Sequence, residues 1–334
     1  MSGASRLTLA TVLSLGLCVP ASAATVTLVV TDSPGEGFND LTAVSPVAGN
    51  PAITRGGQRL NAFQAAADVW GATLRSDVTI VVEAAMDPLA PCTPGGGVLG
   101  AAGPNSVFRD FPNAPEGLTW YAGALADSLN GSDLQPGAGD IGATFNSDVD
   151  SNPNCLTGIT WWYGIGTPPA PNTIDFFTTV LHEIGHGVGF LTFVNGATGV
   201  KFLGFDDAFM KRLEDHSTGL LWSAMNNTQR AASAIDSSDL HWVGAEVTAN
   251  IGVLSGGTAS GHVRMYAPNP LQPGSSVSHW DTALSPNELM EPSLTSDAAD
   301  LLTTLLLEDI GWGVGIFDDG FESGDTSAWS SAAP

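Results

Sequence analysis

Apolar residues recur at two different spacings along the first third of the chain. Residues 25–31 alternate between threonine and apolar side chains, which is typical of a β-strand. Five apolar residues then recur at helical spacing: Leu60, Phe63, Ala67, Trp70 and Leu74. The β-branched run 78–82 follows directly and indicates another strand. This order of strand, helix and strand predicts an α/β beginning.

The middle of the chain has weaker patterns. Residues 87–139 are mostly Gly, Pro, Asn and Ser with scattered aromatic residues, so we expect irregular structure with little regular core there. Ile141, Ala143 and Phe145 alternate with smaller residues, as in a half-buried strand, and the apolar run 159–163 is a further candidate strand.

Residues 174–190 carry the strongest helical pattern. Five of them share one apolar stripe at roughly 100° per residue: Phe177, Val180, Leu181, Ile184 and Val188. His182 and His186 lie on the opposite side, about 40° apart around the axis and about 6 Å apart along it, so two imidazoles can converge on one ion. Gly187 and Gly189 can end the helix directly after them.

Glu183 completes the pattern H-E-x-x-H. In this pattern two neutral imidazoles bind Zn²⁺, and the carboxylate takes a proton from water at the metal. Two histidines four residues apart also occur by chance on helices. Their position opposite the apolar stripe favours a zinc hydrolase, with Glu183 as its general base.

A catalytic zinc needs a third protein ligand. Thr192 occupies the position where one large group of such enzymes carries a third histidine. The remaining candidates are the other histidines and the acids near them: His216, His241, His262, His279, Glu214 and Asp281. We expect His216 and His241 to be surface or packing residues. Glu214 fits a different plan, in which a second helix supplies the ligand, and Asp281 is a candidate for orienting an imidazole.

HEIGHGVGF and the distant SHWDTALSPNELMEP resemble the leishmanolysin-like branch of the metzincin metallopeptidases, in its bacterial secreted subgroup. The resemblance implies zinc ligation by His182, His186 and His279, with Glu183 as general base. It also implies that Met290, which follows His279 by 11 residues, is the Met-turn residue beneath the metal. The likeness runs patchily over residues 60–312 and is strong only in these two segments. The dense cysteine framework of leishmanolysin is missing.

The resemblance also implies a fold and an activity. We expect an α+β domain over residues 24–313, with an α/β-type upper part, a twisted sheet, the active-site helix and a lower subdomain from about residue 190. A closing helix is expected over 297–308, and FDDAFMKRLED predicts a short helix within 205–215. The implied function is a zinc endopeptidase acting on protein or peptide. Two alternatives are a non-enzymatic binding or adhesion protein, and a zinc hydrolase of a non-peptide amide or ester.

Charge narrows the set of partners. The 334 residues hold 10 Lys plus Arg against 34 Asp plus Glu, a net charge of −24, which excludes a basic surface for nucleic acid or anionic membranes. We expect a monomer. The acidic segments 140–150 and 318–325 offer oxygen ligands of the kind that Ca²⁺ prefers, although a solvated acidic surface explains them better.

The two ends and the cysteines indicate export. Residues 1–23 combine Arg6, an apolar run and the small residues Ala-Ser-Ala, which predicts a signal peptide and a secreted, cell-surface or periplasmic protein without membrane insertion. Cleavage removes Cys18 and leaves Cys92 and Cys155, which we expect to form a disulfide; a free Cys92 that ligates the metal is the alternative. Residues 314–334 are expected to be an acidic, flexible tail.

Overall fold

The computed structural model describes residues 22–293 and 299–314. The predicted signal peptide at 1–23 lies outside this range except for its last two residues, and the predicted tail at 314–334 lies outside it except for its first. The acidic segment 318–325 is also outside the described residues.

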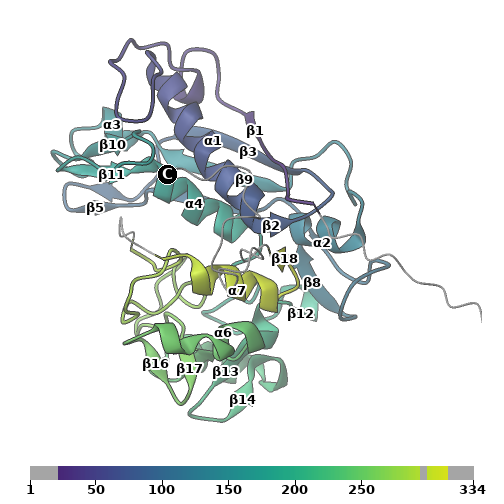
Figure 1. Cartoon of the computed structure of the whole chain (residues 1–334). Helices are drawn as coiled ribbons and strands as arrows, with labels where there is room; N and C mark the ends of the chain where they lie inside the picture. The colour runs from purple at the N-terminus through teal and green to yellow at the C-terminus, as the bar shows by residue number, and fades with distance from the viewer. Residues whose placement is uncertain (1–21, 294–298, 315–334) are drawn as a thin grey trace, which may run out of the picture.

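A four-stranded sheet forms the upper part of the molecule (Figure 1). Its strands are β1 (Val26–Val30), β3 (Ile80–Asp87), β9 (Ile141–Asn146) and β6 (Gly100–Pro104), in that spatial order. The first three are parallel, and β6 is antiparallel at the edge. The strands predicted at 25–31 and 141–145 are confirmed, and the one predicted at 78–82 starts slightly later.

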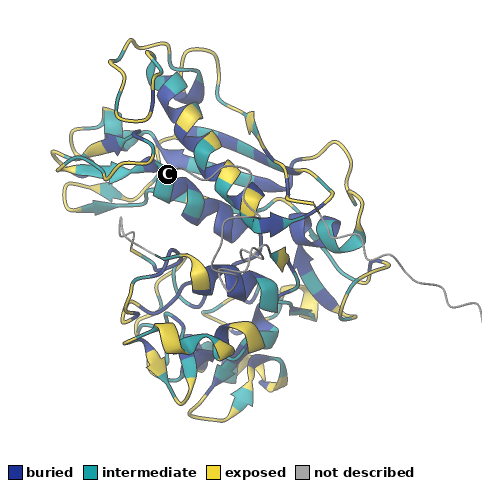
Figure 2. Ribbon diagram, in the orientation of Figure 1, coloured by how far each residue is buried: buried dark blue, intermediate teal, exposed yellow. Residues whose placement is uncertain are grey.

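Two long helices, α1 (Arg55–Thr73) and α4 (Phe176–Gly187), pack side by side against this sheet (Figure 1). Both were predicted from the apolar spacing. Trp70 of α1 is buried, and its indole Nε1 donates to the Leu181 carbonyl of α4 at 3.0 Å. Figure 2 shows the buried residues concentrated where these helices meet the sheet. The aromatic core between them contains Phe38, Phe63, Phe145 and Phe176.

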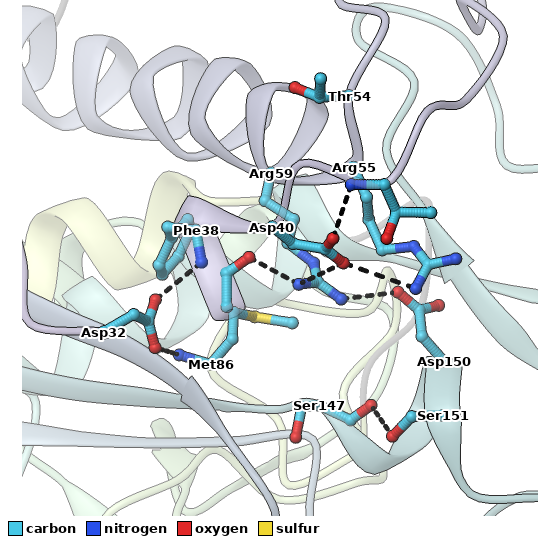
Figure 3. A network of polar contacts seen from close by, with 12 residues as sticks. Asp32, Phe38, Asp40, Thr54, Arg55, Arg59, Met86, Ser147, Asp150 and Ser151 are labelled. Carbon is cyan, nitrogen blue, oxygen red and sulfur yellow. Dashed lines mark hydrogen bonds and ion pairs between the residues drawn. The ribbon is translucent and has the colours of Figure 1, made fainter. Parts of the chain in front are cut away.

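A polar network holds the segment before α1 in place (Figure 3). The Arg59 guanidinium is buried and donates to the Asp150 carboxylate at 3.0 Å and to the Tyr163 hydroxyl at 2.9 Å. Asp32 accepts from the backbone N–H groups of Phe38 at 2.7 Å and of Met86 at 2.9 Å. A further bond from Arg59 to the Gly37 carbonyl at 2.7 Å joins α1 to residues 32–40, so the network connects this segment with α1 and β3, and α1 with α3 and the residue after β10.

In the acidic segment 140–150, two of the carboxylates already bond to other groups of the protein. Asp150 belongs to the network around Arg59, and the Asp140 carboxylate accepts from the Val81 backbone N–H at 2.7 Å. Within the described residues, no group of three acids there brings its oxygens together as a metal site would. A calcium site remains a prediction without support from this geometry.

The expectation of irregular structure over 87–139 was wrong. The segment contains five strands and a helix: β4 (Cys92–Thr93), β5 (Gly96–Gly97), β6 (Gly100–Pro104), β7 (Val107–Phe108), β8 (Thr119–Ala122) and α2 (Gly123–Asn130). The strand β6 is built from GAAGP, which has no apolar alternation. Small residues are needed there because β6 packs closely on α4, and this removes the signal that sequence analysis relies on.

Several short elements complete the upper part and join it to the rest: η1 (Gly37–Asn39), β2 (Leu74–Arg75), α3 (Asp148–Ser151), β10 (Thr160–Trp162), β11 (Thr173–Asp175) and β18 (Gly313–Val314). The disulfide predicted between Cys92 and Cys155 is confirmed, so Cys92 is not a free thiol. It fastens the β4–β5 hairpin to the loop after α3.

The lower part is built on a five-stranded antiparallel sheet (Figure 1). In spatial order its strands are β14 (Leu220–Leu221), β13 (Leu213–Asp215), β15 (Leu240–Trp242), β17 (His262–Arg264) and β16 (Thr258–Ala259). The helices around it are η2 (Phe202–Gly204), η4 (Trp222–Ala224), α5 (Asn227–Ser233), α6 (Ala245–Ala249), η5 (Ile251–Val253) and α7 (Leu301–Asp309).

Two predicted helices in this part need correction. Residues 205–215 form β12 (Asp206–Asp207), the single 3₁₀ turn η3 (Met210–Arg212) and β13 in place of one helix. The Asp207 carboxylate is buried and accepts from three different groups, so it anchors the chain where a helix was expected to begin. The closing helix starts at 301, and not at 297, because Ala299 bonds the segment 287–289 in a β-bridge. Residues 294–298 are not described.

The described chain is therefore a mixed α+β protein with several small sheets, in agreement with the α+β part of the expected fold. Within its described residues, no helix is both long enough and apolar enough to cross a membrane.

Candidate metal centre

The helix α4 has well-defined ends. Asp175 precedes it, and its carboxylate accepts from the Thr178 hydroxyl at 2.6 Å. The helix ends at Gly187, and Gly189 follows with φ +122°, a conformation that favours glycine. A Cβ at Gly187 would lie 2.4 Å from Ile141 of β9. Glycine is thus required at both positions, by packing at the first and by backbone conformation at the second.

Three histidines meet between the upper and lower parts. His182 and His186 come from α4, and His279 comes from the segment that follows the lower sheet. The His279 Nε2 atom lies 3.2 Å from the Nε2 atom of His182 and 3.2 Å from that of His186. All three side chains are buried. The sequence-predicted ligands are therefore brought together into one group that could hold a metal ion.

Each imidazole is oriented through its other nitrogen. The Nδ1 atoms donate to three backbone carbonyls, of Leu289 at 2.8 Å, Phe190 at 2.9 Å and Ser275 at 2.8 Å. Because a carbonyl can only accept, Nδ1 must carry the proton in each ring, which leaves an unprotonated lone pair on each Nε2. Three lone pairs consequently face one another.

Burial also keeps these imidazoles neutral. Desolvation lowers the pKa of His182 to about 4 and that of His186 to about 3, and it lowers the pKa of His279 well below its usual value. Neutral Nε2 atoms cannot hydrogen-bond to one another, so the space among these three lone pairs suits a cation. Ligand distances of about 2.0–2.1 Å in tetrahedral zinc place two nitrogens roughly 3.3 Å apart. The observed 3.2 Å separations fit such a group.

Glu183 lies next to this group, on the same helix. Its carboxylate is buried and accepts from the Ala102 backbone N–H of β6. Desolvation raises the pKa of Glu183 to about 8, and this hydrogen bond opposes the shift only partly. A Cβ at Gly100 would lie 2.7 Å from the Glu183 Oε1 atom, so β6 passes directly over the carboxylate. Sequence analysis missed this contact because β6 itself was missed.

Met290 packs beneath the same turn of α4. Its side chain is fully buried, and a Cβ at Gly185 would lie 2.7 Å from its sulfur. The backbone N–H of Trp280 donates to the Met290 carbonyl at 2.8 Å, which joins the methionine segment to that of His279. The methionine therefore packs against the turn of α4 that carries His182 and His186.

Glu288 was not singled out from the sequence. Its buried carboxylate accepts from the Leu302 backbone N–H at 3.1 Å and from the Thr303 hydroxyl at 3.1 Å, so it fastens the methionine segment to the start of α7. Desolvation raises the pKa of Glu288 to about 7. No spacing rule points to this residue, because its partners are backbone groups and a hydroxyl from a distant helix.

Asp281 does not orient an imidazole, contrary to the expectation. Its carboxylate accepts from the Arg264 guanidinium at 2.8 Å, while the Nδ1 atom of His279 bonds to a carbonyl. Glu214 is also not a ligand of this group, since it lies in β13 opposite His241.

A cavity of about 420 Å³ adjoins His186. Its walls come from Ala102 of β6, from 191–197 after α4 and from 271–278 before His279. Thr192 is among the lining residues, and none of them other than His186 is titratable. The cavity therefore presents apolar and uncharged polar atoms next to the histidine group.

Comparison with known proteins adds no assignment: no protein-family model matches this chain, and no curated protein matches it significantly.

Proposed function

We propose that this protein is a zinc-dependent endopeptidase with a metzincin-type centre of the leishmanolysin-like branch. The observation that carries the proposal is the convergence of three buried imidazoles, each with its proton fixed on Nδ1, beside the buried carboxylate of Glu183. His182, His186 and His279 would hold the ion.

The donor set favours a catalytic ion over a structural one. Structural zinc sites usually have four protein ligands, whereas the group found among the described residues has three. When bound, zinc would supply Lewis-acid polarisation of a substrate carbonyl and lower the pKa of water to about 7. Other divalent metals also bind imidazole, so zinc itself is part of the proposal.

Glu183 would move the proton. Hydrolysis of a peptide forms a C–O bond from water and breaks the C–N bond, so one proton must travel from the water to the departing amine. Glu183 can carry it as general base and then general acid. Its pKa of about 8 applies to the protein without an ion. A neighbouring cation stabilises the carboxylate and lowers that pKa, which favours the base form at neutral pH.

An extended peptide fits the surroundings of the site. The strand β6 pairs with β9 on one side only and forms the edge of the four-stranded sheet. Backbone groups on a free sheet edge can pair with an extended chain, and a pocket beside such an edge takes a side chain. The cavity next to His186 is a pocket of this kind, with Ala102 of β6 in its wall. These features favour a peptide over a small ester or amide.

The test uses metal analysis and digestion of an unfolded protein. We expect one zinc per chain, cleavage that a chelator abolishes, and a Glu183→Gln variant that retains zinc but does not cleave. Asp281→Asn is the matched control, since the Asp281 carboxylate bonds to Arg264 and is not part of the three-histidine group. A Glu183→Gln variant that loads zinc and cleaves normally would remove the general base from the proposal. Zinc without cleavage in any variant would favour the binding-protein alternative, and cleavage of esters alone would favour the non-peptide hydrolase.

The proposed setting is extracellular. A disulfide between Cys92 and Cys155 suits an oxidising compartment, in agreement with the export expected from residues 1–23. Mass spectrometry of the secreted chain would test the expected start at residue 24.

A further inference from the structure

The three histidines outside the metal centre also lie together. The chain has six histidines, and those not yet assigned come from three places in the lower sheet: His216 after β13, His241 in β15 and His262 in β17. The ring centroids of His216 and His241 are 5.6 Å apart, and those of His241 and His262 are 6.4 Å apart. We name these three residues the histidine row.

The central imidazole has an unused lone pair. His241 is fully buried, and its Nε2 atom bonds to the Ser238 carbonyl at 3.0 Å, so Nε2 carries the proton. Its Nδ1 atom is then an acceptor, and it finds no hydrogen-bond partner among the described residues. A buried acceptor without a partner destabilises the folded chain. Packing alone does not explain a histidine here, because an apolar side chain would avoid that cost.

The outer imidazoles are held only by hydroxyl groups. His216 Nε2 lies 2.8 Å from the Ser260 hydroxyl, and His262 Nδ1 lies 3.3 Å from the Thr248 hydroxyl. A hydroxyl either donates or accepts, so neither contact fixes which nitrogen is protonated. The His216 side chain is about half exposed, which leaves it free to turn.

The surroundings of the row are acidic. Glu214 is the cross-strand neighbour of His241, and its carboxylate lies 3.9 Å from the Nδ1 atom of His216. Asp236 lies near enough to His241 to interact with it electrostatically, and burial, together with the charges of Asp215 and Asp239, raises the pKa of Asp236. Besides Glu214, the carboxyl groups of Asp215, Asp236 and Asp239 thus lie in the surroundings of the histidine row. Arg264, which pairs across from His241, is neutralised by Asp281 at 2.8 Å.

Burial and the neighbouring imidazoles lower the pKa of His241, so its neutral form, which binds metals, is the one present at neutral pH. We propose that the histidine row is a second binding site for a divalent transition metal ion, held by its imidazoles together with the Glu214 carboxylate. Imidazole with carboxylate suits Zn²⁺, Cu²⁺ and Ni²⁺. The proposal does not depend on peptidase activity.

The row is more open than the metal centre. Ring centroids at the centre are 4.7–5.1 Å apart, and only there do three ligand atoms of the described residues lie within 4.8 Å of one another. Binding at the row therefore requires the exposed His216 side chain to rotate. We expect the second ion to be held more weakly than the first.

The experiment counts zinc ions bound to the full chain in equilibrium dialysis at increasing free Zn²⁺. The wild type is expected to take up two ions, and a His216→Ala/His262→Ala variant only one. A Ser260→Ala/Thr248→Ala variant is the matched control, because it removes the hydroxyl partners of the same imidazoles but keeps their nitrogens, and it should still bind two. Circular dichroism establishes that each variant is folded.

A second readout identifies the ligands. With the metal centre filled by zinc, Cu²⁺ bound at the histidine row should give an electron paramagnetic resonance spectrum with nitrogen hyperfine splitting. The affinity of the row for Cu²⁺ should be more than about 10-fold lower in the His216→Ala/His262→Ala variant. Uptake of a single ion by the wild type, or of two by the histidine variant, would overturn the proposal. Absence of peptidase activity would leave it standing and count against the proposed function only.

Discussion

Replacing Glu288 by glutamine should change how the stability of the protein depends on pH. The folded-state pKa of Glu288 is about 7, above its ordinary 4.5, because the carboxyl is buried. The folded chain therefore binds this proton more tightly than the unfolded chain does. Stability from this group is fully present below pH 4.5 and is lost as the pH rises through 7. The loss is about 1.4 kcal/mol per pKa unit, or about 3 kcal/mol in all.

Glutamine resembles the protonated carboxyl in shape but does not titrate. The free energy of unfolding of Glu288→Gln, relative to wild type, should therefore rise by about 3 kcal/mol between pH 4.5 and pH 8. Urea denaturation of the metal-free chain at both pH values measures it. An exposed substitution, Glu36→Gln, is the control. If the difference in the free energy of unfolding between Glu288→Gln and wild type is the same at both pH values, the argument that burial raises the pKa of Glu288 is refuted.

Three other predictions concern the site and its supports. Gly100→Val should reduce kcat for a peptide by more than about 10-fold while zinc content is unchanged, because its Cβ meets Glu183; unchanged kcat would contradict the packing of β6. A Cys92→Ala/Cys155→Ala variant should lose about 4 kcal/mol in urea unfolding, from the loop of 63 residues that the disulfide closes; a loss below 1 kcal/mol would contradict this. Asp281→Asn should keep its zinc in dialysis, and release of the ion would show that Asp281 supports a ligand after all.

The sequence was sufficient for the parts of the site that are local. His182 and His186 lie on one helix, so their spacing alone places them side by side. His279 follows 92 intervening residues, and only the resemblance selected it from the remaining histidines. No periodicity relates a helix to an irregular segment that comes 92 residues later in the chain, so spacing could not have made that choice.

The misses have physical causes. Small residues allow β6 to approach α4 closely, and the same property hides the strand from pattern analysis. Asp207 precedes a possible helix in the sequence, yet its carboxylate is used by groups on a neighbouring segment. Asp281 lies two residues after the candidate ligand His279 and bonds to Arg264 of β17. In each case a tertiary contact overrode a local rule.

The three candidate ligands are divided between two parts of the chain, and this division determines when during folding the proposed site can be complete. Two of them lie on α4, whereas His279 follows the lower sheet in the chain, so the three meet only when the two parts are packed together. A chain made from its N-terminus carries Glu183 and the first pair long before the third imidazole. If the chain is the hydrolase proposed above, a partly synthesised or truncated chain without His279 would hold an incomplete site, and activity would begin only once folding is complete.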